Sequence, residues 1–212
     1  MKLRARWSAC MAIAALWVLP AAIAHARSAQ NPPSSSADMQ SQMQQALAAA
    51  QPGPQHAQLM KVAGDYTTRE TFYASGSEPQ ESTGTAKLKP ILGGRFLEEE
   101  NSGQSFGQPY SGLRLYGYNN GSKQYEAIWI YDGSTAFLVL DGTSDDNGKT
   151  VRYSGAFLGP DGERQTLRVT ITHDDADHFT VKLLGESAGG MSTLETVYTR
   201  VRKSAPAPQS RK

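Results

Sequence analysis

The chain has 212 residues, of which 39% are hydrophobic, a formal net charge of +1 and one cysteine. A charge so close to zero argues against general nucleic-acid binding, which needs a concentrated basic surface. A single cysteine excludes an internal disulfide, so the fold must be stable through burial of apolar side chains alone.

Residues 1–26 have the features of an export signal. Basic side chains precede an apolar stretch from Ala9 to Ala24, and Ala24-His25-Ala26 is a small-x-small cleavage site. Cys10 lies too early in this stretch for a lipoprotein attachment site. We therefore predict secretion across the inner membrane, a periplasmic location and no membrane span after cleavage. An uncleaved N-terminal anchor is the alternative.

Two segments lack the composition of a folded core. Residues 27–53 are rich in Gln, Ala, Ser and Pro, which predicts a disordered tether with at most a transient helix from Asp38 to Ala50. Residues 203–212 combine two prolines with three basic residues and are expected to be a disordered tail. The folded domain is therefore predicted to span residues 54–202.

A short helix is expected to open this domain. Pro54 suits a first helical turn, and Gly64 suits the position after the last turn. The helical spacing places an apolar set on one face, which consists of His56, Leu59, Met60 and Ala63.

After Gly64 the pattern changes to ten strand-like runs separated by short connections. The predicted strands are 65–73, 82–91, 94–102, 111–118, 123–131, 135–141, 149–158, 164–173, 178–185 and 192–202. Connections this short join antiparallel neighbours and leave no room for crossover helices.

Five Asn-Gly or Asp-Gly pairs support hairpins, because these residues tolerate the positive φ angles of tight turns. We expect Asp141-Gly142 and Asn147-Gly148 to bound one longer turn. The remaining pairs predict a turn each, at Asn120-Gly121, Asp132-Gly133 and Asp161-Gly162.

Alternation along the strands gives one apolar and one polar face, which is typical of a sheet that is wet on one side. Ten such strands in sequence order predict a closed antiparallel up-and-down barrel, an all-β fold wide enough to hold a cavity. Which face points inward stays open. An outer-membrane barrel has its apolar face outward, but charges on both faces at Glu98, Glu99 and Glu100 argue against it.

Several blocks resemble the DUF1579 family. They are Pro52 to His56, the run Ile91-Leu92-Gly93-Gly94-Arg95-Phe96-Leu97, Tyr116-Gly117-Tyr118 with Trp129-Ile130, and the last strand with Glu195, Tyr198 and Arg200. The resemblance covers about residues 52 to 202 and implies a calycin-like (lipocalin-like) barrel. It implies no particular activity. Tyr66 and Tyr131 stand where many members have Trp and Asp, so roles of those residues do not transfer.

Two local motifs suggest chemistry but are better explained as turns. Gly185 to Gly190 fits Gly-x-Ser-x-Gly, yet no Asp or His follows Ser187 and the next segment alternates like a strand. His173, Asp177 and His178 are weak metal candidates, because acidic residues also favour turn geometry. We therefore predict neither a catalytic serine nor a bound metal.

The last strand carries the preferred ligand-binding candidates. Tyr198 and Arg200 share a face, where they are expected to bind the carboxylate head group of an amphipathic molecule. The apolar part of that molecule is expected to lie near Trp129. Glu195, on the other face, completes the candidate set. Alternatively, Arg200 lies outside or pairs with an acid of residues 98–100 to close the barrel. No cofactor is predicted, although haem bound by His56, His173 or His178 is an alternative.

Three hypotheses follow for function. The first is an exported protein that binds a small apolar or amphipathic ligand in the barrel. The second is a structural or interaction protein of the cell envelope with a filled barrel. The third is an enzyme that uses an acid of residues 98–100 inside the barrel, and it ranks last because a charged run is usually solvated. The sequence leaves the oligomeric state open.

Overall fold

The computed structural model describes residues 35–74, 76–105, 107–159, 162–187 and 190–202. The predicted export signal, the start of the predicted tether and the predicted tail lie outside these residues. Residues 42–212 form one unit, which contains the barrel. Among the described residues, no helix is both long enough and apolar enough to cross a membrane.

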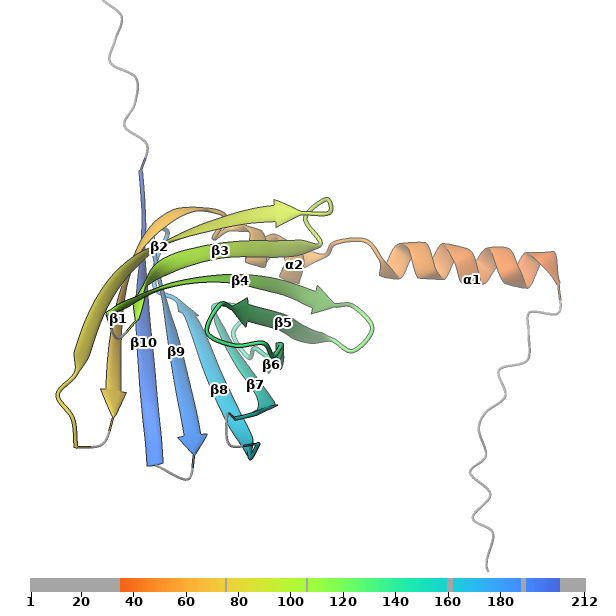
Figure 1. Ribbon diagram of the computed structural model, residues 1–212. Helices are drawn as coiled ribbons and strands as arrows, with labels where there is room; N and C mark the ends of the chain where they lie inside the picture. The colour runs from red at the N-terminus through yellow and green to blue at the C-terminus, as the bar shows by residue number, and fades with distance from the viewer. Residues whose placement is uncertain (1–34, 75, 106, 160–161, 188–189, 203–212) are drawn as a thin grey trace, which may run out of the picture. The chain divides into compact units, whose positions relative to one another are not determined.

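Ten antiparallel strands form a closed barrel in which each strand pairs with the next and β1 pairs with β10 (Figure 1). The prediction of an all-β up-and-down barrel is confirmed. The strands are β1 (Gly64–Ala74), β2 (Gln80–Ile91), β3 (Phe96–Ser105), β4 (Gln108–Asn119), β5 (Gln124–Tyr131), β6 (Leu138–Thr143), β7 (Thr150–Leu158), β8 (Arg164–His173), β9 (His178–Ser187) and β10 (Gly190–Arg200).

Within the described residues, two helices precede the barrel. Helix α1 (Ser36–Ala49) lies within the segment expected to be a tether, and none of its residues is buried. Helix α2 (Pro54–Met60) begins at the predicted proline, and the Gly53 amide donates to His56 Nδ1 over 3.0 Å. His56 and Leu59 are buried, and Met60 and Ala63 are partly buried against the core, which agrees with the predicted apolar face.

The apolar face of the strands points into the barrel, which settles the orientation that alternation left open. The interior includes Tyr66, Leu97, Leu140, Val169 and Val181, each about 1% exposed. Charged side chains pair on the outer face, where Lys89 contacts Glu98 at 2.7 Å and Glu100 at 2.8 Å. In contrast, Glu99 points inward between these two acids and is 1% exposed.

One turn prediction is wrong. Asp141 and Gly142 lie inside β6, paired with Ser154 and Tyr153 of β7, and do not bound a turn. Position 142 has room only for a glycine, because a Cβ atom there would lie 2.5 Å from Cδ1 of the Tyr153 ring. Asn147-Gly148 does form a turn, with φ angles of 63° and 85°. A glycine that makes room for an aromatic ring therefore has the same sequence signature as a turn glycine.

The two barrel ends differ. Helix α2 lies against β3 and β4 at one end, here called the α2 end, where the Leu59 side chain joins the core. The other end, here called the far end, is formed by strand ends at Ala74, Ser105, Tyr131, Leu158 and Ser187. This asymmetry leaves the far end as the route into the interior.

Candidate ligand-binding site

A buried ion pair lies in the middle of the barrel. The Arg114 Nη1 atom of β4 donates to Glu99 Oε1 of β3 over 3.0 Å and to the Tyr198 hydroxyl of β10 over 2.8 Å. Tyr198 donates to Glu99 Oε1 over 2.8 Å, and Tyr116 donates to Glu99 Oε2 over 2.9 Å. Asn101 Nδ2 adds a longer bond of 3.2 Å to Oε1. The Glu99 carboxylate thus accepts four hydrogen bonds, which offset the cost of burying its charge.

Burial and the neighbouring charges shift the pKa values of Arg114, Tyr116 and Tyr198 in this cluster. Burial disfavours the charged form of Arg114, but the Glu99 carboxylate and Tyr198 outweigh it and raise the pKa of the guanidinium above its usual range. Burial, reinforced by Glu99, raises the pKa values of Tyr116 and Tyr198 well above those of free tyrosine. Both tyrosines therefore stay neutral donors at neutral pH.

Arg114 also forms the floor of a cavity of about 470 Å³. Its guanidinium carbon lies 4.4 Å from the ring centroid of Trp129 on β5, a cation–π distance. Trp129 is 4% exposed, and its Nε1 atom is buried without a hydrogen-bond partner among the described residues. A buried N–H without an acceptor is costly, so this indole lowers the stability of the barrel interior.

The cavity has a polar and an apolar wall. Glu70 of β1, Asn101 of β3, and Tyr110 and Arg114 of β4 form the polar wall. The opposite wall is apolar and comes from β6 to β10, with Leu138, Phe157, Leu167, Leu183 and Leu194. This arrangement suits a molecule with a polar head and an apolar body.

The cavity opens toward the far end of the barrel, since residues beside the ends of β3, β4 and β5 line its mouth. They include Ser105, Gln108, Pro109, Asp132 and Ser134. Toward the α2 end the interior is packed, and only about 20 Å³ of space remains between Leu59, Glu99 and their neighbours. The interior is therefore not filled throughout, in contrast to the barrel expected for a purely structural protein.

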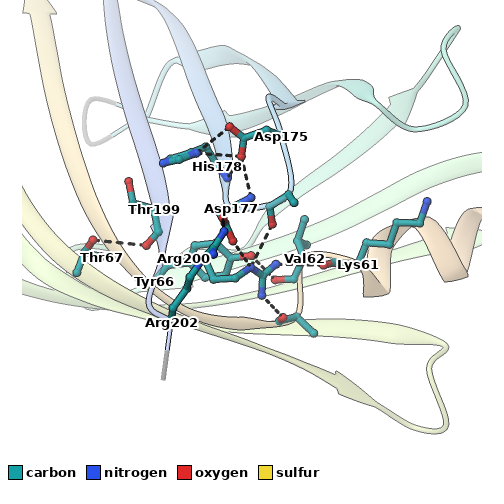
Figure 2. Close-up of polar contacts among 12 residues, drawn as sticks. Lys61, Val62, Tyr66, Thr67, Asp175, Asp177, His178, Thr199, Arg200 and Arg202 are labelled. Carbon is teal, nitrogen blue, oxygen red and sulfur yellow. Dashed lines mark hydrogen bonds and ion pairs between the residues drawn. The ribbon is translucent and has the colours of Figure 1, made fainter. Parts of the chain in front are cut away.

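Arg200 lies at the α2 end, where Figure 2 shows it beside Lys61 and Val62, and it does not line the cavity. Its Nη1 donates to the Ala63 carbonyl over 2.6 Å and its Nη2 to the Lys61 carbonyl over 3.1 Å. The guanidinium carbon lies 4.9 Å from the Tyr66 ring centroid, and Asp177 is 3.8 Å from Nε. Arg200 thus ties the segment after α2 to β10 and the β8–β9 connection.

The other two candidates on the last strand, Tyr198 and Glu195, lie on opposite faces of the barrel wall. Tyr198 belongs to the Glu99–Arg114 cluster beneath the cavity. Glu195 points outward and pairs with Lys182 of β9 at 2.7 Å. Of the four sequence candidates, Trp129 is therefore the one whose side chain lines the cavity.

The weak metal candidates have separate surroundings. His173 packs 6.1 Å from the Phe179 ring, and burial lowers its pKa. The His178 ring contacts Asp175 at 2.9 Å, while Asp177 contacts Arg200 and Arg202. Within the described ranges, no group of three or more His, Cys, Asp or Glu side chains has a metal-binding arrangement. None of the described histidines lines the cavity.

The Gly-x-Ser-x-Gly segment lies between two strands. Strand β9 ends at Ser187, β10 begins at Gly190, and residues 188–189 lie outside the described residues. A nucleophile elbow needs a helix after its serine, and here a strand follows.

Sequence reasoning missed most of the polar wall. Arg114 lies between two leucines, and Glu99, beneath this wall, is one of three adjacent acids of which the sequence does not identify the inward one. One signal was present, because Arg114 shares a strand face with Tyr116 and Tyr118, which are aromatic and inward-facing. A basic residue in the aromatic face of a strand is unusual on a solvated surface and indicates a buried charge.

Comparisons with known proteins identify a family and a fold. The family model described as "Protein of unknown function (DUF1579)" matches residues 51–200. One similar solved structure is Rv2717c from M. tuberculosis, which is 16% identical to this chain and has a TM-score of 0.53. The match covers 72% of this chain and 100% of that chain. The S-type phycobiliprotein lyase CPES from Guillardia theta has 8% identity, coverage of 68% and 90%, and a TM-score of 0.52. At these identities the likeness concerns the fold alone. No curated protein sequence matches the chain.

Proposed function

We propose that this chain, which belongs to the DUF1579 family, binds one small amphipathic molecule inside its barrel. The observation that carries the proposal is the two-walled cavity of about 470 Å³ above Arg114 and Trp129. Its volume lies within the range of small-molecule sites, roughly 300–1,000 Å³.

The cavity floor supports binding better than catalysis. Glu99 is held by Arg114 and by the hydroxyls of Tyr116 and Tyr198. It lies beneath Arg114 and does not line the cavity of about 470 Å³. The Arg114 guanidinium therefore lies between Glu99 and a molecule bound in this cavity. A general acid or base must reach its substrate within hydrogen-bond distance, and Glu99 is poorly placed to do so.

We also propose that binding takes place in the periplasm, as the export signal in residues 1–26 predicts. Native mass spectrometry of protein recovered from the periplasmic fraction tests both proposals. We expect a chain that begins at Arg27, with a non-covalent adduct that disappears on denaturation. Recovery of the uncleaved chain in the membrane fraction would contradict the location. A spectrum without an adduct would leave ligand binding to the titration below.

Filling the cavity is expected to weaken binding. Leu183→Trp places an indole in the apolar wall, and the affinity for the neutral fluorophore N-phenylnaphthylamine should fall by about tenfold or more, since displacing even part of a buried apolar contact costs over 1 kcal/mol. Titration of fluorophore fluorescence measures the change.

Leu184→Trp is the matched control, because Leu184 is the next residue of β9 and alternation places it on the outer face. Its affinity should equal that of the unmodified protein. Equal loss in both variants would place the fluorophore elsewhere on the molecule.

A further inference from the structure

One acid in the cavity lacks a basic partner. Glu70 of β1 is 8% exposed and lines both the cavity and an adjoining pocket of about 660 Å³ at the far end. The Tyr110 hydroxyl donates a hydrogen bond to Glu70 Oε1. Among the described residues, no Lys, Arg or His forms an ion pair with Glu70. A buried carboxylate with one neutral donor has unused capacity to accept hydrogen bonds.

The charges around the cavity do not cancel. Arg114 is the one basic side chain among the described residues that line it, and its Nη1 is already paired with Glu99. Glu70 therefore leaves an excess negative charge inside the barrel. Asp132 at the mouth and Glu81 in the adjoining pocket have the same sign. Because the interior has a lower dielectric constant than water, this excess acts strongly on a charged ligand.

We infer that the polar head of the ligand is a cation, a protonated amine that donates to Glu70 while its apolar tail lies on the β6–β10 wall. The inference rests on the proposed binding function and specifies its ligand class. The sequence suggested a carboxylate head group bound by Arg200 and Tyr198, but neither residue lines the cavity. A carboxylate there would have other neighbours. It would lie beside Glu70, and the Arg114 guanidinium already forms an ion pair with Glu99.

Three ligands with the same tail test the inference by displacement of N-phenylnaphthylamine. They are dodecylamine, dodecanol and dodecanoate. The unmodified protein should bind the amine at least about tenfold more tightly than the carboxylate, the effect of one charge-assisted hydrogen bond. Glu70→Gln should weaken amine binding by about tenfold, strengthen carboxylate binding, and change alcohol binding by less than about threefold.

Glu195→Gln is the matched control, because it removes the same charge from the outer face of β10. Its three ligand affinities should follow the same order as those of the unmodified protein. Tyr110→Phe keeps the Glu70 charge while removing its hydroxyl partner, so the amine preference should persist. If Glu70→Gln does not fold, the inference is judged from the order of the three ligand affinities in the unmodified protein and in Tyr110→Phe.

Tighter binding of dodecanoate than of dodecylamine would overturn the inference and leave the binding function in place. The inference also fails if Glu70→Gln folds, as judged by its urea midpoint, and leaves the amine-to-carboxylate ratio unchanged. If neither the fluorophore nor any of the three ligands binds the unmodified protein, the proposed function itself fails.

Discussion

Glu99→Gln is expected to lower the free energy of unfolding by about 3–5 kcal/mol, the cost of leaving one member of a buried ion pair without its partner. The Arg114 guanidinium would remain buried, with its Nη1 facing a neutral amide. The amide oxygen of the introduced glutamine would still accept from the tyrosine hydroxyls, so the loss reports mainly on the charge. Urea unfolding followed by circular dichroism measures it.

Glu98→Gln is the matched control, because Glu98 neighbours Glu99 and points outward toward Lys89. We expect a change of less than about 1 kcal/mol, as for other exposed ion pairs. Replacing Glu99 and Arg114 together by leucine should restore much of the lost stability, since apolar replacement of a whole buried pair is often neutral or stabilising. Similar costs for Glu98→Gln and Glu99→Gln would show that the buried charge contributes little.

Alkaline pH is expected to unfold the protein steeply. Burial raises the pKa values of Tyr116, Tyr153 and Tyr198 above their unfolded value, which is about 10. Groups with raised pKa values contribute stability that is fully present below pH of about 10 and is lost as the pH rises toward the folded pKa. Each such tyrosine lowers stability by about 1.4 kcal/mol per pH unit in this range, so these three together lower it by about 4 kcal/mol per pH unit.

Urea unfolding at successive pH values above about 9 measures this slope, and the tyrosinate absorbance of the buried tyrosines should rise together with unfolding. Tyr153→Phe should reduce the slope by about one tyrosine's share, roughly 1.4 kcal/mol per pH unit. Tyr131→Phe is the control, because Tyr131 is 45% exposed. Tyrosinate absorbance beyond the share of the exposed Tyr73 and Tyr131, at a pH where the protein is still folded, would contradict the burial of these hydroxyls.

These two expectations concern the cluster that supports the cavity. Glu99 and Tyr198 hold Arg114 where it stacks on Trp129, so the same contacts that stabilise the barrel also shape the floor of the site. A polar cluster that is fully hydrogen-bonded is rigid, and a rigid floor lowers the entropic cost of binding. Stability and binding are therefore expected to change together in variants of Glu99.

The arrangement of the strands was predictable because its signals are local. Alternation, turn residues and short connections each depend on a few neighbouring residues, and they gave ten strands close to the observed ones and a helix at Pro54. The error at Asp141-Gly142 has a different origin. Gly142 is small because Tyr153 of the next strand lies over it, and sequence spacing carries no information about that contact.

The site was less predictable, since it depends on which residues of distant strands meet. The last strand suggested Arg200 as the ligand-binding arginine, yet Arg200 contacts the segment after α2, and Arg114 of β4 occupies the cavity floor. Both arginines share a strand face with aromatic residues, so the local patterns are similar. Their positions along the barrel axis distinguish them, and these follow from the register of the closed sheet.

The sequence by itself determined the barrel, its strand order and its short entry helix, because periodicity and turn chemistry act over a few residues. Only the tertiary structure decided that the apolar face is internal, that Glu99 and Arg114 pair inside, and that Glu70 lacks a basic partner among the described residues. The physical reason is that ring closure brings together β1, β3, β4 and β10, which are far apart in the chain, and the charge of the cavity is a sum over all of them.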